Sequence, residues 1–106
     1  MIIAMLRIKV PGERRKDFLD SAQLIIGPTK VQPGCISCGF YQDLYDLEAI
    51  LFVEEWESRE SLDHHIKSES YRIILSLLEL SGEPPKIKIN TVSKMEGLEA
   101  IEALRS

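Results

Sequence analysis

The stretch from Ala49 to His65, AILFVEEWESRESLDHH, decides the fold. It begins as a strand that is apolar on both faces, reaches Trp56, and passes directly into a helix that carries two histidines. Side chains alternate along a strand. One face of this strand therefore carries Ile50, Phe52 and Trp56, and the other carries Leu51 and Val53. Helices of the same chain can cover one face of a small sheet, so we expect the second face to be covered by a partner molecule or a ligand.

Length and composition indicate one soluble globular domain. A chain of 106 residues can bury a core without disulfides or metals, and 28% charged with 44% hydrophobic residues is ordinary for such a domain. The formal net charge of -4 gives no electrostatic footprint for nucleic acid. The opening MIIAMLRIKV lacks the pattern of a targeting segment, and no apolar run is long enough to span a bilayer. We expect a cytoplasmic protein that binds neither nucleic acid nor membrane.

Cys35 and Cys38 form a CxxC motif, which invites a redox or zinc interpretation. Residues three apart on a strand face opposite sides of the sheet, so we expect the two thiols on opposite faces. No second CxxC or histidine cluster completes a set of four metal ligands. A redox CxxC normally opens a helix, whereas this one follows Pro33-Gly34 and lies among strand residues. The pattern favours two reduced, partly buried thiols and no metal site.

Periodicity places the other elements around this stretch. Alternation predicts a strand over residues 2–10, and a single apolar stripe predicts a helix over 13–26 that Gly27-Pro28 should end. A strand near 36–41 should form an antiparallel hairpin with the quoted strand. Ser58 is a candidate N-cap for the next helix. A second helical segment is expected over 69–80, either continuous with the first or separated from it by a kink near Ser68. A last strand covers 86–90. The order β-α-β-β-α-β predicts an α+β, ferredoxin-like fold with a four-stranded antiparallel sheet.

The tail from residue 93 to 106 predicts a short extra helix beyond a domain of residues 1–92. Ser93 and Glu96 have the spacing of a capping box, and Leu98, Ile101 and Leu104 recur at three-residue steps. So short a helix is unstable alone, so we expect its apolar side to dock on its own domain or on a partner.

A family resemblance is carried by the Pro33-Gly34-Cys35 step, by the run from Val53 to Ser58, VEEWES, and by His65 nine positions beyond Trp56. These features resemble the antibiotic biosynthesis monooxygenase family over about residues 1–92. The resemblance implies a dimeric α+β barrel, in which the open sheet faces of two identical subunits pack around a cavity. It also implies an oxygenase that uses no cofactor and acts with O2 on a small phenol, quinol or polyketide-like aromatic.

Such chemistry requires a base, positive potential and a dry pocket. His65 is the leading candidate base, because it shares a helix side with Leu62 and Ile66, where partial burial keeps it neutral. His64 lies about 100° around the helix and should be solvated. The alternative for His65 is a packed side chain satisfied by Glu55 or by backbone. Trp56 is the second catalytic candidate, with an indole N–H that can donate to a substrate oxygen; the alternative is a core aromatic.

The residues expected to bind substrate are Arg7, Tyr41, Phe52 and Tyr71. If the apolar side of the first strand faces the helices, Arg7 and Lys9 project toward the cavity, and Lys88 and Asn90 join them if the last strand buries Ile87 and Ile89. Such a face would stabilise an anionic aromatic. The alternative places these charges at exposed strand ends.

Two further functions fit the same architecture. One is a dimeric module that binds a small apolar ligand without turnover. The other is a haem-binding or haem-degrading protein. Related haem-degrading enzymes use an Asn-Trp-His trio with the asparagine near the first strand, whereas the only asparagine of this chain is Asn90, in the last strand. That departure disfavours haem degradation.

Overall fold

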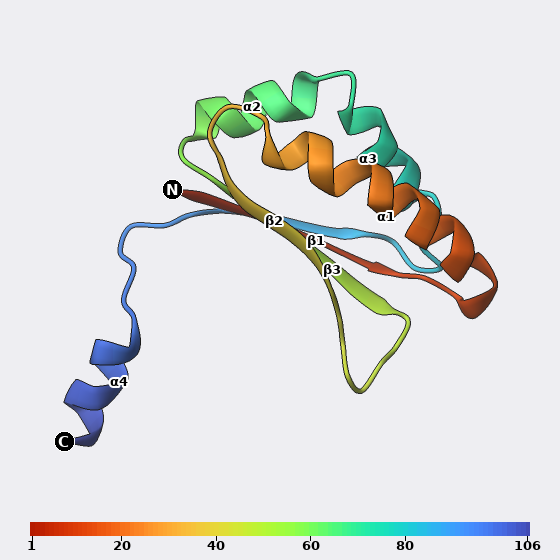
Figure 1. Ribbon diagram of the computed structural model, residues 1–106. Coiled ribbons are helices and arrows are strands. Elements are labelled where there is room, and N and C mark those ends of the chain that lie inside the picture. Colours follow the sequence, from red (N-terminus) through yellow and green to blue (C-terminus); the bar gives the residue numbers. More distant parts are fainter.

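The computed structural model describes residues 1–106 and contains one four-stranded antiparallel sheet in the order β2-β3-β1-β4. The helices between residues 12 and 78 lie on one face of this sheet and leave the other face open (Figure 1). The order of elements confirms the predicted α+β, ferredoxin-like fold. The strands are β1 (Ile2–Lys9), β2 (Cys35–Gln42), β3 (Ala49–Trp56) and β4 (Lys86–Thr91). The helices are η1 (Gly12–Arg14), α1 (Arg15–Lys30), α2 (Arg59–Lys67), α3 (Tyr71–Leu78) and α4 (Leu98–Arg105).

The two faces of the sheet follow the alternation of β1. Ile2, Ala4, Leu6 and Ile8 are buried toward the helices, while the residues between them lie on the open face. Leu6 is paired with Phe52 on β3 and with Ile87 on β4. The main core between sheet and helices comprises Leu6, Ile8, Val10, Phe18, Ile25, Ile50, Phe52, Ile74 and Leu77.

Helix α1 continues to Lys30, so the predicted end at Gly27-Pro28 is wrong. Pro28 removes one backbone hydrogen bond, but it lies close to the helix end, and Gly27 has no Cβ to clash with the proline ring. Ile25 and Thr29 are both buried, so packing against the sheet holds the last turn in place. This extension positions the following loop, including Gln32, beside α2.

The segment after β3 forms two helices with a break at Ser68, which decides between the continuous helix and the kink that the sequence left open. Ser58 is the N-cap of α2, and its Oγ accepts a hydrogen bond from the Ser61 N–H at 3.1 Å. Ser68 has extended backbone angles, and its Oγ donates to the His65 carbonyl at 2.6 Å. Both ends of α2 are therefore fixed by serine side chains.

Helix α4 lies away from the sheet (Figure 1). The predicted capping box is wrong, because Gly97 is the N-cap and its N–H donates to Glu99 Oε1 at 2.8 Å. Leu98, Ile101 and Leu104 are exposed, Leu104 at 88%. The apolar side of α4 is therefore not covered by its own domain. No helix of the chain combines the length and the apolarity required to cross a bilayer.

Candidate functional site

His65 lies at the end of the second turn of α2 and faces the sheet. Its side chain is 1% exposed. Nδ1 is 2.8 Å from Gln32 Oε1, and Nε2 is 2.7 Å from Glu54 Oε2. The Gln32 amide nitrogen donates to Ser70 Oγ at 3.0 Å, which leaves Oε1 to accept from Nδ1–H. Gln32 therefore fixes which ring nitrogen of His65 carries a proton.

Glu54 is the acidic member of the pair and is 4% exposed on the helix side of β3. Its Oε2 lies within ion-pair distance of His65 Nε2 but is not aligned for a hydrogen bond. Two buried atoms of this kind are stable at 2.7 Å only when one of them is protonated, because lone pairs would otherwise face each other. The pair therefore brings a buried carboxyl group and the second ring nitrogen of His65 into close contact, while Nδ1 is held by Gln32.

Trp56 and Tyr71 enclose this pair with aromatic surface. Trp56 is fully buried and stacks on His65, with ring centroids 4.6 Å apart and planes 27° apart. Tyr71 meets the same imidazole edge-on at 5.1 Å. Trp56 Nε1 is buried without a hydrogen-bond partner in the protein, which is uncommon for a native indole. Burial and then the charge of Glu54 raise the pKa of Tyr71, so its hydroxyl remains a donor at neutral pH.

An apolar groove opens beside Glu54, between the β1–β4 edge of the sheet and helices α2 and α3. Its enclosed volume is about 30 Å³, roughly that of one water molecule. Glu54 is its one ionisable acid, and a ring-sized ligand would have to move α2 and α3 away from β4. The groove is lined by Ala4, Met5, Leu6, Glu54, Leu62, Ile66, Tyr71, Ile74, Ile87 and Ile89.

A larger hollow of about 500 Å³ lies on the opposite, open face of the sheet. Arg7 and Tyr41 line it together with Lys86 and Lys88. Arg7 is paired with Lys86, so cations from neighbouring strands lie side by side. Asn90 lies on the same face and donates to the Ile3 carbonyl at 3.4 Å. This hollow has the charge that would attract an anionic ligand.

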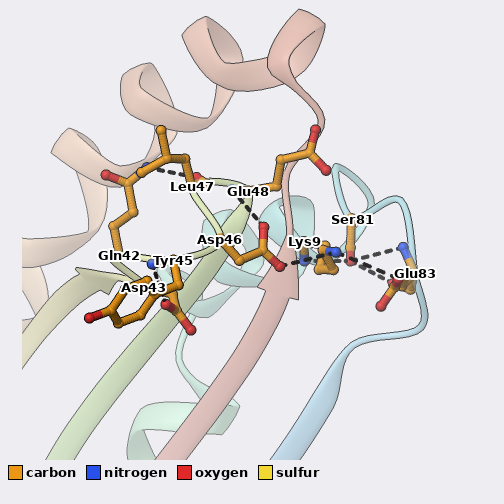
Figure 2. Close-up of polar contacts among 9 residues, drawn as sticks. All are labelled: Lys9, Gln42, Asp43, Tyr45, Asp46, Leu47, Glu48, Ser81 and Glu83. Carbon is orange, nitrogen blue, oxygen red and sulfur yellow. Dashed lines mark hydrogen bonds and ion pairs between the residues drawn. The ribbon is translucent and has the colours of Figure 1, made fainter.

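Lys9 does not contribute a free cation to that hollow. Figure 2 shows it at the end of β1, where Nζ lies 3.1 Å from Asp46 Oδ2 and 3.9 Å from Glu83 Oε1. The hydrogen bond and charge of Asp46 raise the pKa of Lys9, and the same contact lowers the pKa of Asp46. The expectation that Lys9 projects toward a ligand therefore gives way to a role at the strand end.

The predicted site residues divide between the two faces of the sheet. His65, Trp56 and Tyr71 lie together on the helix side, whereas Arg7 and Tyr41 line the hollow on the open side. Phe52 lines neither cavity. It is 2% exposed and stacks on Phe40 with centroids 4.5 Å apart, so the expectation that it binds substrate is corrected to a packing role in the core.

Sequence reasoning missed two members of the site, Glu54 and Gln32. The sequence does contain a signal for Glu54, because alternation back from Trp56 places residue 54 on the same face. The proposed partner, Glu55, is wrong: it lies on the open side and accepts a hydrogen bond from Ser37 Oγ at 2.5 Å. Gln32 follows the unforeseen last turn of α1, and no local pattern marks it.

Cys35 and Cys38 do not face opposite sides of the sheet, so that expectation is also wrong. A register shift between Cys35 and Ser37 inserts an extra residue into β2, so Cys35 is paired with Trp56 and Cys38 with Glu54. Both thiols therefore lie on the helix side. Both are free and half-buried.

The model of the antibiotic biosynthesis monooxygenase family matches residues 1–74. An uncharacterised protein of Synechocystis sp. is 31% identical over 98 residues, which are 92% of this chain and 67% of that protein. A conserved protein from Methanosarcina mazei Go1 has 31% identity and a TM-score of 0.80, covering 84% of this chain and 89% of the other.

Two further crystal structures share the fold at lower identity. One is an antibiotic biosynthesis monooxygenase with a TM-score of 0.80 and 19% identity, covering 89% of this chain and 100% of the other. The second, a protein from Mycobacterium tuberculosis, has a TM-score of 0.81 and 22% identity, covering 91% of this chain and 98% of the other.

Proposed function

Because the chain belongs to the antibiotic biosynthesis monooxygenase family, we propose that it oxidises a small phenolic, quinol or polyketide-like aromatic with O2, without a bound cofactor. The observation that carries this proposal is the buried Glu54–His65 pair, at 2.7 Å, beside an apolar groove. Buried acid–base pairs next to a cavity are characteristic of sites that move protons.

The reaction is driven by the substrate's own electrons. Loss of the phenolic proton gives a phenolate, which transfers an electron to O2. Recombination of the two radicals forms a carbon–oxygen bond and a peroxide anion on the ring, which takes up the released proton to become a hydroperoxide. Loss of the hydrogen on that carbon and cleavage of the O–O bond then give a ketone or quinone and one water. One oxygen atom enters the product and the other leaves as water. The protein has to accept the first proton and exclude solvent.

The Glu54–His65 pair fits the role of proton acceptor. The Glu54 carboxylate and His65 Nε2 are the two positions of the pair that can accept a proton, since Nδ1 contacts Gln32. Gln32 holds the imidazole in a fixed orientation through Nδ1. Trp56 Nε1 and the Tyr71 hydroxyl are donors that would contact the developing negative charge.

We propose further that two copies form a homodimer through their open sheet faces. The hollow lined by Arg7 and Tyr41 would then be closed by the second subunit, and the exposed apolar side of α4 supports an arm that reaches the partner. Localisation in the cytoplasm remains a prediction from the sequence.

A second function, binding of a small ligand without turnover, is favoured by one observation. The open-face hollow is far larger than the groove beside Glu54 and brings Arg7, Lys86 and Lys88 together. Such a site would take an anionic ligand and would show saturable binding without O2 consumption.

Oxygen uptake distinguishes the two functions. A panel of quinols and polyphenols is screened with a metal chelator present, using the wild-type chain, His65→Asn, and His64→Asn as the matched control on the exposed side of α2. Asparagine can still donate toward Gln32 but cannot take up a proton. We expect the wild type to consume O2 and His65→Asn to do so at a rate lower by about 100-fold or more. His64→Asn should consume O2 at the wild-type rate. Equal rates in both variants, or no uptake with saturable binding, would contradict the oxygenase proposal.

A further inference from the structure

The irregularity in β2 creates a dithiol that the regular strand would not have. Between Cys35 and Cys38 the chain contains one more residue than the facing part of β3, and Ile36 occupies the bulge with its side chain exposed. The two cysteines thereby come to lie opposite Trp56 and Glu54, which are two residues apart on β3. A bulge in an edge strand brings both thiols to one side.

The spacing of the two cysteines can be bounded from this register. Residues two apart in a strand have Cα atoms about 6.7 Å apart, and Cys35 and Cys38 span the same interval on β2. Disulfides join Cα atoms that are usually about 4.4–6.8 Å apart. The pair therefore lies at the upper end of that range, and β2 is an edge strand that is held by β3 alone and can shift slightly. A bond formed here would be strained and readily reduced.

The surroundings connect the dithiol to the acid–base site. Cys35 is paired with Trp56 across the strands and packs against the buried cluster of Ile2, Ala4, Trp56 and Leu62. Cys38 Sγ lies 3.8 Å from the Ile26 carbonyl oxygen, to which it donates. Both cysteines share the helix side of the sheet with Glu54. Closing a disulfide would draw Cys35 along the strand, away from the indole it contacts.

We propose that Cys35 and Cys38 form a reversible intramolecular disulfide when the folded protein meets a peroxide. The Cys35 thiolate attacks one peroxide oxygen, the O–O bond breaks, and hydroxide leaves to give a sulfenic acid. The Cys38 thiolate then attacks the Cys35 sulfur, forming the S–S bond and expelling the second hydroxide. Two thiols and one hydrogen peroxide thus give one disulfide and two waters. A small thiol restores the dithiol by exchange.

The charges around the pair make this reaction slow at neutral pH and faster in base. Burial, then the charge of Cys35, then that of Glu54 raise the pKa of Cys38 to about 11. Burial and Glu54 also raise the pKa of Cys35, by less, while Lys30 of α1 acts in the opposite direction on both. Because the thiolate is the attacking species, the rate should rise as pH increases from 7 to 9. Cys35 has the lower pKa and is the expected first nucleophile.

The test uses the full chain, folded, with hydrogen peroxide as the oxidant. After the peroxide is removed, the protein is unfolded in the presence of iodoacetamide, which alkylates free thiols. Digestion with trypsin then leaves both cysteines in the peptide of residues 31–59. We expect this peptide to lose two hydrogen atoms and to carry no alkylated thiol, and dithiothreitol to restore two alkylated thiols. The fluorescence of Trp56, the only tryptophan, should change on oxidation and return on reduction.

Single variants identify the order of attack. In Cys38→Ser, peroxide should leave a sulfenic acid on Cys35 that dimedone traps, whereas Cys35→Ser should react much more slowly. Sulfinic acid in the wild-type peptide, a disulfide between two chains, or two thiols that remain alkylatable after peroxide treatment would each overturn the proposal. These readouts require no substrate turnover, so they are independent of the oxygenase proposal.

Discussion

At the scale of single residues, burying Glu54 and His65 together carries a desolvation cost that stability alone does not justify. Desolvating a carboxylate and an imidazole costs several kcal/mol per charge, and well-packed apolar residues often replace such pairs without loss. Here the pair lies 2.7 Å apart, under the ring of Trp56 and beside a groove. The proton transfer proposed above would explain why polar groups occupy this position in the core.

Replacing Glu54 by glutamine removes the carboxylate while keeping its shape. We expect Glu54→Gln to lower the rate of O2 uptake by about 100-fold or more, because the amide cannot accept the substrate proton. Glu55→Gln, on the open face, is the matched control and should retain activity. An active Glu54→Gln variant would exclude the acid–base role.

Removing the imidazole should reveal the cost of an uncompensated acid. We expect His65→Ala to lower the free energy of unfolding by about 3–5 kcal/mol, because Glu54 is left buried without a partner. Adding Glu54→Gln to that variant should recover part of the loss. Urea denaturation of the two single variants and the double variant measures this, and strictly additive losses would contradict the coupling.

Ionisation of Cys38 should make the folded protein less stable at alkaline pH. Its pKa is raised from 9.0 to about 11 in the folded protein, so the folded state holds this proton more tightly than the unfolded state. The protonated Cys38 thiol therefore makes its full contribution to the free energy of unfolding below pH 9, and this contribution is lost as the pH rises toward 11. Under reducing conditions, we expect the melting temperature of the wild type to fall more steeply over this interval than that of Cys38→Ala. Parallel curves would show that the thiol is not protected by burial.

At the scale of elements, α2 is the support of His65, and its start depends on Ser58. We expect Ser58→Ala to lower the free energy of unfolding by about 1 kcal/mol. Ser93→Ala serves as the control, since Ser93 caps no helix in the structure, and it should change stability by less than about 0.5 kcal/mol. Equal losses in both variants, measured by urea denaturation, would contradict the capping geometry.

Element-scale features also mark the limit of prediction from sequence. Alternation in β1 and β3 correctly divided the residues of each strand between two faces, because side-chain period and burial agree along both strands. It did not decide which face the helices would cover. The bulge at Ile36 and the last turn of α1 had no local signature, since each is stabilised by contacts distant in sequence. Glu54 was overlooked for a different reason: a carboxylate on the apolar face contradicts hydrophobic patterning, and such exceptions often mark functional sites.

At the scale of the whole molecule, the open sheet face and the apolar side of α4 both lack a covering element (Figure 1). We expect sedimentation at micromolar concentration to give a homodimer of twice the 12.1 kDa chain mass. Deleting residues 93–106 should shift the dimer toward monomer. A stable 12.1 kDa particle would contradict the proposed closure of the open face by a second subunit. It would not affect the Glu54–His65 pair, because both residues belong to the same chain.

The whole-molecule arrangement places the two candidate cavities on opposite sides of one sheet, and a structure determined with a bound phenolic ligand distinguishes them most directly. We predict that α2 and α3 separate from β4, and that the phenolic oxygen lies within hydrogen-bond distance of the Glu54 carboxylate. A ligand seated on the open face against Arg7 and Lys88, with the groove beside Glu54 unchanged, would contradict the proposed mechanism.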